Sequence, residues 1–374
     1  MSKMEVRKLG DIEDLGIIEM GRGNVISKND ILSTPGNYPV YSSSSSNNGE
    51  IGRYGKYMFD DERITWSIDG GGKLFYRNNI KYSVTNVCGW LKVLDEKKII
   101  SKYLYYLLIN QWQKLNFNYS HKAHPSVIRN EYYVPNIEIK VQEEIVKILD
   151  SFTNLIDALN EELSLRQKQF EYYREKLLTF DDKSLLKPIN EIGTLFRGNG
   201  LQKKDFVDEG VGCIHYGQIY TKLGFSLSKP LTYVTKETAK PLTKVRKGDL
   251  VIACTSENIE DVCKSVVWEG EEEIVTGGHA CVLRHNENPR YIGYFFQTHQ
   301  FFMQKKQYAY GAKVIDIKTE KLGEILIPIP PLAIQQSIVE KLDAFESLIA
   351  SLKEEIALRQ KQYEYYREKL LTFD

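Results

Sequence analysis

The chain has 374 residues, of which 42% are hydrophobic, and its 50 basic and 50 acidic residues give no net charge at pH 7. This length suits two domains with connecting elements. No signal peptide and no apolar run long enough to cross a bilayer is found, so we expect a cytoplasmic protein without a membrane partner. The five cysteines form no CxxC pair, which favours reduced thiols over disulfides or a zinc site.

Residues 1–140 form a first block of mixed α and β character. Strands are expected at 64–66, 74–76 and 86–90, and aromatic-rich helical spacing covers 101–113. Polar loops between them carry basic residues, which can reach phosphates, and Ser or Asn, which can read base edges. Solvated surface is the alternative for any one of them. The candidate DNA contacts are Ser43, Ser45, Asn47, Arg53, Tyr54, Lys56, Lys73, Asn118, Tyr119, His121 and Lys122.

A long helical segment follows at 141–182 and returns at 334–374. The stretches 163–181 and 356–374 match at 16 of 19 positions, 193 residues apart. Apolar residues recur at steps of 3 and 4 without Gly or Pro, which is the pattern of a coiled-coil seam about 53 Å long. We expect the two copies to pair with each other. The predicted pairing residues are Ile145, Leu149, Phe152, Ile156, Leu159, Leu163, Phe170, Tyr173, Leu177, Ile338, Leu342, Phe345, Ile349, Leu352, Ile356, Tyr363, Tyr366 and Leu370.

Two features of the repeat leave alternatives open. Arg166 and Arg359 interrupt the two seams at the same place, and each either extends its head to water or pairs with a glutamate of the facing helix. The outward positions are also nearly identical, which pairing does not require. Either the outer face binds the same partner twice, or recombination keeps the copies alike.

Residues 183–333 form a second block of mixed α and β character, with strands expected at 250–253 and 280–283 and a helix at 290–305. Its loops hold a second set of basic and polar candidates. The two blocks carry net charges of +4 and +3 and the repeats −5 and −2, so the blocks can present basic faces. The candidate DNA contacts are Lys203, Lys204, His215, Tyr216, Gln218, Thr255, Ser256, Asn258, His279, Lys305, Tyr308, Tyr310 and Lys313.

Motifs for catalysis are missing from the sequence. Residues 69–73 (DGGGK) do not complete a phosphate loop, the glycine turns at 21–24 and 197–200 do not complete GxGxxG, and no HExxH, GxSxG or metal-spaced Cys/His set occurs. We therefore predict no catalytic residue and no metal site. A stand-alone DNA-binding regulator is the alternative function, and an enzyme with an unrecognised site is a weaker one.

The chain resembles the DNA specificity subunits of Type I restriction–modification systems over essentially its whole length. The resemblance is carried by IPIPPLAIQQSIVEKLDAF at 327–345, the ending LRQKQYEYYREKLLTFD, GDLVIA at 248–253 and IGRYGKYMFD at 51–60. The first block departs from the pattern, with VPNIEIKVQEEIV at 134–146 where the second block has the proline-rich version.

The resemblance implies an α+β fold with two α/β target-recognition domains, separated by two long antiparallel helices that form a coiled coil with internal pseudo-two-fold symmetry. Such a subunit has no catalytic activity and no cofactor of its own. Each domain binds one half of a split, asymmetric DNA target, and two modification (methyltransferase) subunits and the restriction subunits dock on the assembly. S-adenosylmethionine, ATP and Mg are then expected in the partners.

The symmetry of DNA supports the antiparallel pairing. Two similar domains grip a duplex equivalently only when a two-fold axis relates them, with half-sites about 34 Å apart. A two-fold axis perpendicular to the helices makes them antiparallel.

Overall fold

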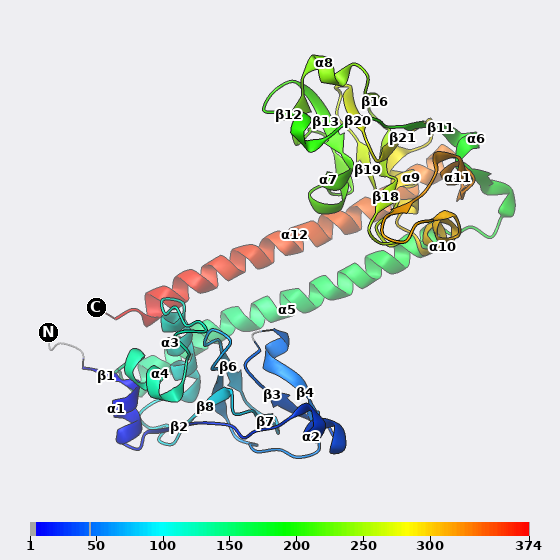
Figure 1. The fold of residues 1–374 in the computed structure, drawn as a ribbon. Coiled ribbons are helices and arrows are strands. Elements are labelled where there is room, and N and C mark those ends of the chain that lie inside the picture. The colour runs from blue at the N-terminus through cyan, green and yellow to red at the C-terminus, as the bar shows by residue number, and fades with distance from the viewer. Residues whose placement is uncertain (1–4, 45, 374) are drawn as a thin grey trace. The chain divides into compact units, whose positions relative to one another are not determined.

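The computed structural model describes residues 5–44 and 46–373, so the candidate Ser45 lies outside the described residues. It divides into two compact units. One comprises residues 1–160 with 354–374, and the other comprises residues 161–353. Each unit therefore contains one α/β domain together with parts of both long helices, and the two are described in turn (Figure 1).

The first domain is built on two sheets. The first has the order β2-β8-β5-β6 and the second the order β4-β3-β7, while β1 and β9 pair antiparallel where the domain begins and ends. The strands are β1 (Val6–Lys8), β2 (Ile18–Arg22), β3 (Tyr38–Tyr41), β4 (Glu50–Tyr54), β5 (Arg63–Ser67), β6 (Leu74–Arg77), β7 (Ser83–Val84), β8 (Cys88–Val93) and β9 (Tyr133–Pro135). The helices are α1 (Leu9–Asp14), α2 (Lys28–Ser33), α3 (Ser101–Trp112), α4 (Pro125–Glu131) and the 3-10 turn Asn47–Gly49.

The core of the first domain lies between the β2-β8-β5-β6 sheet and α3. Every residue of β5 is buried, so this central strand is covered on both faces. On α3, Tyr103, Leu104, Leu107 and Leu108 belong to the same core as Trp66. The three predicted strands and the predicted helix of the first block are confirmed, with β8 beginning two residues later than expected.

The second domain has two five-stranded sheets, in the orders β11-β21-β17-β19-β14 and β12-β15-β13-β20-β16, and the pairs β10-β23 and β18-β22. Its strands are β10 (Leu186–Pro188), β11 (Gly193–Arg197), β12 (Phe206–Val207), β13 (Val211–His215), β14 (Ser226–Leu227), β15 (Thr232–Val234), β16 (Thr243–Val245), β17 (Leu250–Ala253), β18 (Thr255–Ser256), β19 (Ser265–Trp268), β20 (Ile274–Gly277), β21 (Ala280–His285), β22 (Ile315–Asp316) and β23 (Leu326–Pro328). Its helices are α6 (Ile189–Ile192), α7 (Tyr216–Thr221), α8 (Lys236–Ala239), α9 (Pro289–Phe295), α10 (His299–Tyr308), α11 (Thr319–Gly323) and the 3-10 turns Lys183–Leu185 and Lys203–Asp205.

The strands predicted at 250–253 and 280–283 are confirmed, but the single helix predicted over 290–305 is wrong. The chain forms α9 and α10 with a break between them. Thr298 causes the break, because its extended backbone (φ −79°, ψ 155°) ends the first helix and its side chain accepts a hydrogen bond from Phe301 N–H to start the next. The break lets Phe296 and Phe301 stack at 4.2 Å.

Two helices of about forty residues, α5 (Ile139–Leu177) and α12 (Leu332–Leu371), are shared between the units. In the first unit Phe152 of α5 stacks on Tyr366 of α12 with centroids 5.4 Å apart. In the second unit Tyr173 of α5 stacks on Phe345 of α12, again at 5.4 Å. The order of contacts along α12 is the reverse of that along α5, and the two pairs are equivalent positions of the repeat. The predicted antiparallel coiled coil with internal two-fold symmetry is therefore confirmed.

The ends of the seams belong to the domain cores. Ile145 and Leu149 are buried in the core of the first unit, which also contains Tyr363 and Leu371 of α12. Ile338 and Leu342 are buried in the core of the second unit, which also contains Leu178. The predicted pairing residues near the helix starts thus pack against their domain as well.

Arg166 and Arg359 keep 39% and 37% of their side-chain surface exposed, as expected for arginines that extend to water. Each guanidinium bonds to a glutamate one turn earlier on its own helix, Glu162 at 3.3 Å and Glu355 at 3.1 Å. Each also donates to a glutamine three residues later on the same helix. Both arginines are thereby held along the surface of their own helix.

Each domain is seated on its helix by equivalent side chains. The buried Gln142 accepts from Ile100 N–H (2.9 Å) and donates to Lys98 O (3.0 Å), and its repeat equivalent Gln335 accepts from Asn288 N–H (3.0 Å). An aspartate two turns further along each helix makes a second pair of equivalent contacts. Asp150 accepts from Tyr106 and Lys102, and Asp343 accepts from Tyr294 and Arg290. The repeat in sequence is therefore also a repeated way of mounting a domain.

None of the helices in the described part of the chain contains a stretch both long and apolar enough to span a bilayer.

Candidate DNA interface

The β3–β4 hairpin gathers one group of first-domain candidates. Ser43 and Asn47 lie in the loop that joins the two strands, Arg53 and Tyr54 lie on β4, and Lys56 follows directly. Asn47, Arg53 and Lys56 are exposed, and Arg53 pairs with Glu50 at 3.0 Å. A two-stranded ribbon with a polar tip has dimensions that fit the major groove of DNA.

Two further candidate segments lie beside this hairpin. A Cβ placed on Gly70 would come 2.0 Å from the carbonyl oxygen of Ser43, so the turn before Lys73 packs against the hairpin loop. Lys122 forms an ion pair with Asp69 of the same turn at 2.8 Å, and this contact raises the pKa of Lys122. The structure thus brings the three candidate segments of the first domain together.

The loop at 118–122 is itself tightly built. The side-chain oxygen Oδ1 of Asn118 accepts from Ser120 N–H, from the Ser120 hydroxyl and from His121 N–H, so this side chain shapes the loop. His121 pairs with Glu131 and stacks on Phe117. Tyr119 is 82% exposed, which makes it the candidate best placed to stack on a base.

A groove of about 370 Å³ gathers one group of second-domain candidates. Its lining includes Tyr216, Thr255, Ser256 and Asn258, together with Tyr220, Thr221, Glu257, Asp261 and Val314. Within the groove Thr255 is buried, and both polar atoms of the Asn258 side chain are bonded to Asp261. Tyr216 and Ser256 are partly exposed there, and Asn258 is exposed.

His215 and Gln218 build the start of α7 and are buried. His215 Nδ1 accepts from Gly217 N–H at 3.1 Å, and Gln218 accepts from His215 N–H at 2.9 Å. Burial, and after it the nearby Lys203 and His279, lower the pKa of His215. These contacts hold Tyr216 in place, and its ring meets His279 at 5.0 Å. A direct DNA contact by His215 or Gln218 does not fit this arrangement.

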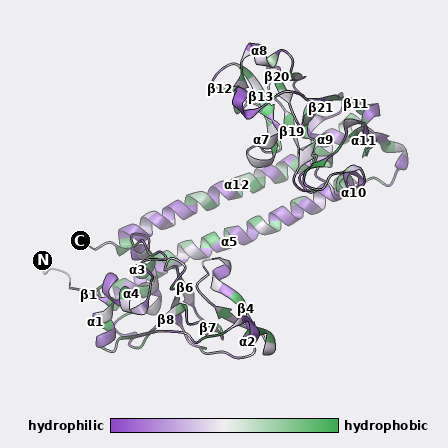
Figure 2. Cartoon of the chain, viewed as in Figure 1, coloured by the Kyte–Doolittle hydropathy of each residue, from purple (hydrophilic) through white to green (hydrophobic). Residues whose placement is uncertain are grey.

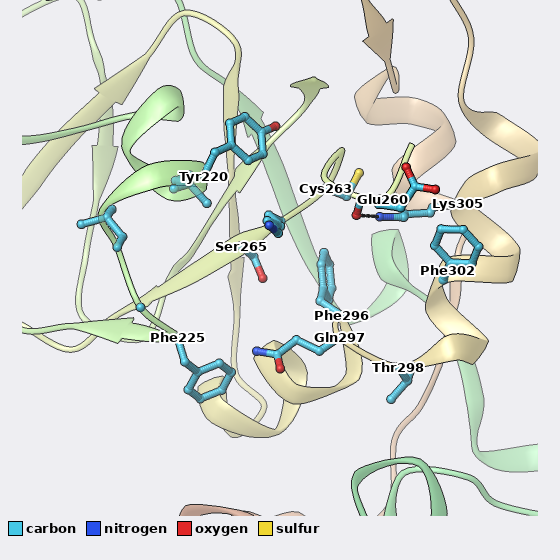
Figure 3. A pocket seen from close by; sticks show the side chains of 14 residues that line it. Tyr220, Phe225, Glu260, Cys263, Ser265, Phe296, Gln297, Thr298, Phe302 and Lys305 are labelled. Atoms are coloured by element: carbon cyan, nitrogen blue, oxygen red, sulfur yellow. Dashed lines mark hydrogen bonds between the residues drawn. The ribbon is translucent and has the colours of Figure 1, made fainter. Parts of the chain in front are cut away.

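Lys305 is the clearest departure from the predicted set. It is 4% exposed and lines a cavity of about 430 Å³, where its ammonium donates to Glu260 O (2.9 Å) and Val262 O (2.6 Å) (Figure 3). Burial lowers the pKa of Lys305. Because Lys305 ties α10 to the loop before β19, its role in the structure is internal.

The remaining second-domain candidates lie at the surface. Lys203, Lys204, His279 and Lys313 are exposed. Tyr308 is half-buried with Lys321 over its ring, and Tyr310 is 50% exposed and bonds to Asp316. For these residues, as for the exposed ones of the first domain, DNA contact stays a prediction.

Arg63 and Arg77 are two buried arginines that were not among the predicted site residues, and Arg77 contacts the β3–β4 hairpin loop. Their only signal in the sequence is a charged residue at each end of the strand pair Arg63–Ser67 and Leu74–Arg77. Over residues 5–44 and 46–373, no group of three or more His, Cys, Asp or Glu side chains is arranged to hold a metal ion. All five cysteines are buried and unpaired.

Comparison with known proteins gives a consistent result. A family model described as "Type I restriction modification DNA specificity domain" matches residues 1–165 and 186–358. The specificity subunit of the Type I restriction enzyme EcoR124I/EcoR124II from Escherichia coli is 30% identical over 298 residues, covering 75% of this chain and 72% of that protein. A putative type I restriction enzyme specificity subunit from Haemophilus influenzae is 28% identical and covers 100% of this chain and 96% of its own length.

Solved structures support the fold. The crystal structure of a Type I restriction-modification S subunit from M. genitalium matches with a TM-score of 0.60 at 14% identity, covering 100% of this chain and 97% of that one. A second solved structure, described as the structural basis of complex assembly and conformational transition of the type I R-M system, contains a chain that matches with a TM-score of 0.57 at 13% identity. The match covers 100% of this chain and 99% of that one.

The fold defines a class of internally duplicated proteins. In this class, equivalent contacts attach two α/β domains with exposed polar loops to a pair of antiparallel helices. Within that class, the chain belongs to the family of DNA specificity subunits of Type I restriction–modification systems. Members of this family supply specificity and not catalysis, so the prediction that the chain is not itself an enzyme is confirmed.

Proposed function

We propose that the chain recognises a bipartite, asymmetric DNA target and docks two modification subunits. The observation that carries the proposal is that equivalent residues of the two helices attach the two domains, whereas the exposed loops of the two domains differ in sequence. Gln142 and Asp150 seat one domain as Gln335 and Asp343 seat the other. The exposed loops of the two domains share no such correspondence. Each domain then reads its own half-site, and the half-sites differ in sequence.

The proposed DNA contacts divide into two kinds. Exposed cations such as Lys56, Lys203 and Lys313 contact phosphates, which makes binding depend on salt. Asn47 at the hairpin tip and Ser256 in the second-domain groove offer polar groups that suit base edges. Phosphate contacts set the position of each domain, and the polar contacts set the sequence it prefers.

The proposed docking surface for modification subunits is a set of exposed apolar residues that occurs once on each helix, and we call each set the docking stripe. On α5 it consists of Val141, Leu155, Leu165 and Tyr172, and on α12 of the equivalent Ile334, Leu348, Leu358 and Tyr365. Equivalent residues are equally exposed, at 59% and 60% for Leu165 and Leu358 and at 59% for both tyrosines. Figure 2 shows hydrophobic residues interspersed among hydrophilic ones along both helices. Two like surfaces suit two copies of one partner.

In this proposal the reaction chemistry belongs to the partners. S-adenosylmethionine is used by the modification subunits, and ATP and Mg by the restriction subunits, while this chain works with them on DNA in the cytoplasm. A stand-alone regulator is the second candidate function. It gives no reason for the repeated exposed stripe, because such a regulator needs no partner.

The proposal is tested by mapping methylated adenines across the genome of cells that express the modification subunits with and without this chain. We expect a split motif with two different halves that appears only with the chain. A continuous or palindromic motif would contradict the proposal. Tight sequence-specific binding by the purified chain without a partner would favour the regulator.

A further inference from the structure

Two buried arginines lie directly opposite each other in the first domain, and one of them, Arg77, contacts the β3–β4 hairpin loop. Arg63 begins β5 and Arg77 ends β6, and the register of the two antiparallel strands pairs them. Their exposed fractions are 8% and 2%. Like charges in directly opposed positions destabilise a sheet, and burial adds the cost of lost hydration. The pair therefore calls for an explanation beyond packing.

The two arginines are compensated differently. Arg63 makes two bonds to the Asp61 carboxylate, at 2.6 and 3.0 Å, and lies over the rings of Phe59 and Trp90. Arg77 lies 3.5 Å from the ring centroid of Tyr41. Within residues 5–44 and 46–373, Arg77 has no carboxylate at ion-pair distance, and burial lowers its pKa.

The hydrogen bonds of Arg77 point to the hairpin loop. Its Nε donates to Thr65 Oγ1 at 3.1 Å, and its Nη2 donates to the carbonyl oxygen of Asn48 at 2.7 Å. A Cβ placed on Gly49 would come 3.5 Å from the same Nη2, so the guanidinium also packs under that residue. The Arg77 side chain thus packs against the loop and is hydrogen-bonded to it.

The loop needs this support because of its backbone. Asn47, Asn48 and Gly49 have φ values of 46°, 54° and 81°, so three consecutive residues are left-handed. Left-handed residues occur singly as a rule, and a run of them persists only where the surroundings fix it. The backbone hydrogen bonds from Gly49 N–H to Ser46 O and from Ser42 N–H to Gly49 O help to close the turn. Arg77 contacts the turn through the carbonyl oxygen of Asn48.

We propose that Arg77 is a positioning residue that fixes the Asn47–Gly49 turn in the shape with which the first domain reads its half-site. This inference rests on the proposed function, since the hairpin must contact DNA for the shape to matter. The fork of the guanidinium is the required feature, because it reaches the Asn48 carbonyl and Thr65 together while it stacks on Tyr41. A lysine keeps the charge but offers no planar fork.

The test compares Arg77→Lys and Arg77→Met with the unchanged chain, each in the full complex with modification subunits. Arg7→Met removes the same charge from the β1–β9 end of the same domain and serves as the control. Methylation motifs are mapped for all four, and binding is measured on duplexes carrying single base changes in either half. We expect both Arg77 variants to lose about tenfold in discrimination at one half-site only. The control should keep both halves.

A second measurement does not depend on DNA. Hydrogen exchange of the free chain should be faster at the Gly49 and Ser42 amides in Arg77→Lys than in the unchanged chain, with the β2-β8-β5-β6 sheet unaffected. Unchanged exchange and an unchanged motif would overturn the inference. So would equal losses at both half-sites together with a lower midpoint of thermal unfolding, which would mean a merely structural role. If the unchanged chain directs no split motif, the proposed function fails instead, and the exchange result still decides whether Arg77 holds the turn.

Discussion

At the scale of single residues, a carboxylate on each long helix is the main polar attachment of its domain. Asp150 accepts from the Tyr106 hydroxyl at 2.6 Å and from Lys102 at 2.9 Å, and Asp343 accepts from Tyr294 at 2.6 Å. The bonded tyrosines are buried, and burial together with the bonded carboxylate raises the pKa of each hydroxyl. The hydroxyls therefore stay protonated and act as donors.

Replacing Asp150 with Asn should lower the free energy of unfolding by about 2 kcal/mol, because a charged acceptor is lost under a buried hydroxyl and an ammonium. Asp343→Asn should have an effect of similar size on the second unit. Urea unfolding followed by circular dichroism measures both. Asp157→Asn, at an exposed position of α5, is the control. An equal loss in the control would show that general helix charge, and not the attachment, is responsible.

A half-buried histidine predicts a dependence of stability on pH. Burial lowers the pKa of His285, opposed by Glu287 and Asp249, and its Nε2 is buried without a partner among the described residues. The unfolded chain then takes up a proton that the folded chain does not. The stabilising contribution is complete above the unfolded pKa of about 6.5 and falls as the pH drops below it.

We therefore expect the urea midpoint to decrease from pH 7.5 to pH 5.5, and His285→Phe to reduce this decrease. The same change at His299, which is exposed, should leave the decrease as it is in the unchanged chain. Identical pH profiles for His285→Phe and the unchanged chain would contradict this assignment.

Residue type alone could place the candidates in polar loops but could not tell which side chains the fold itself uses. Lys305, Gln218 and Asn258 have the chemistry of DNA contacts, yet each is bonded to nearby backbone or to a neighbouring side chain. The role of Arg77 could not be predicted from the sequence, because it depends on a hydrogen bond to Asn48, 29 residues earlier. Such assignments need the tertiary contacts.

At the scale of elements, each long helix carries two apolar surfaces, the seam and the proposed docking stripe. Leu352 is buried at a seam position, whereas Leu348, one turn earlier, is 39% exposed in the docking stripe. The same substitution at these two positions therefore separates folding from docking.

Leu352→Asp should lower the free energy of unfolding by about 3 kcal/mol, since it removes a buried side chain and places a charge in the seam. Leu348→Asp should leave unfolding nearly unchanged and remove one of two modification subunits from the purified complex. Combined with Leu155→Asp, its repeat equivalent, it should remove both. Thermal unfolding and the mass of the complex by light scattering give the two readouts. A complex of normal mass with the double variant would contradict the docking surface.

The elements themselves were largely predictable. Steps of 3 and 4 over nearly forty residues left no alternative to long helices, and short apolar runs marked β5, β6, β17 and β21. The break between α9 and α10 was not predictable from the pattern, because the segment contains no proline after Pro289 and no glycine after Gly293. It results from a threonine cap and the packing of two phenylalanines.

At the scale of the whole chain, the repeated mounting makes each domain an exchangeable part. Replacing residues 183–326 with the corresponding block of another family member keeps Gln335, Asp343 and both long helices. We expect the methylated motif to change in one half only, with the other half intact. Methylome sequencing checks this, and a change in both halves would contradict independent reading by the domains.

The two-fold repeat and the antiparallel pairing could be anticipated from the duplicated segment and the symmetry of DNA. The composition of each compact unit could not. Asn110 donates to the carbonyl oxygen of Leu371, and Arg367 bonds to Gln113, across more than 250 residues. No periodic signal in a sequence reports contacts of that separation.

Tyr363 and Leu371 complete the hydrophobic core of the unit that begins at the other end of the chain. During synthesis the ribosome makes the first α/β domain early and supplies these closing side chains only after the second domain has been translated. The nascent first domain therefore keeps part of its apolar surface uncovered until then, and a truncation that removes residues 360–373 would weaken that domain.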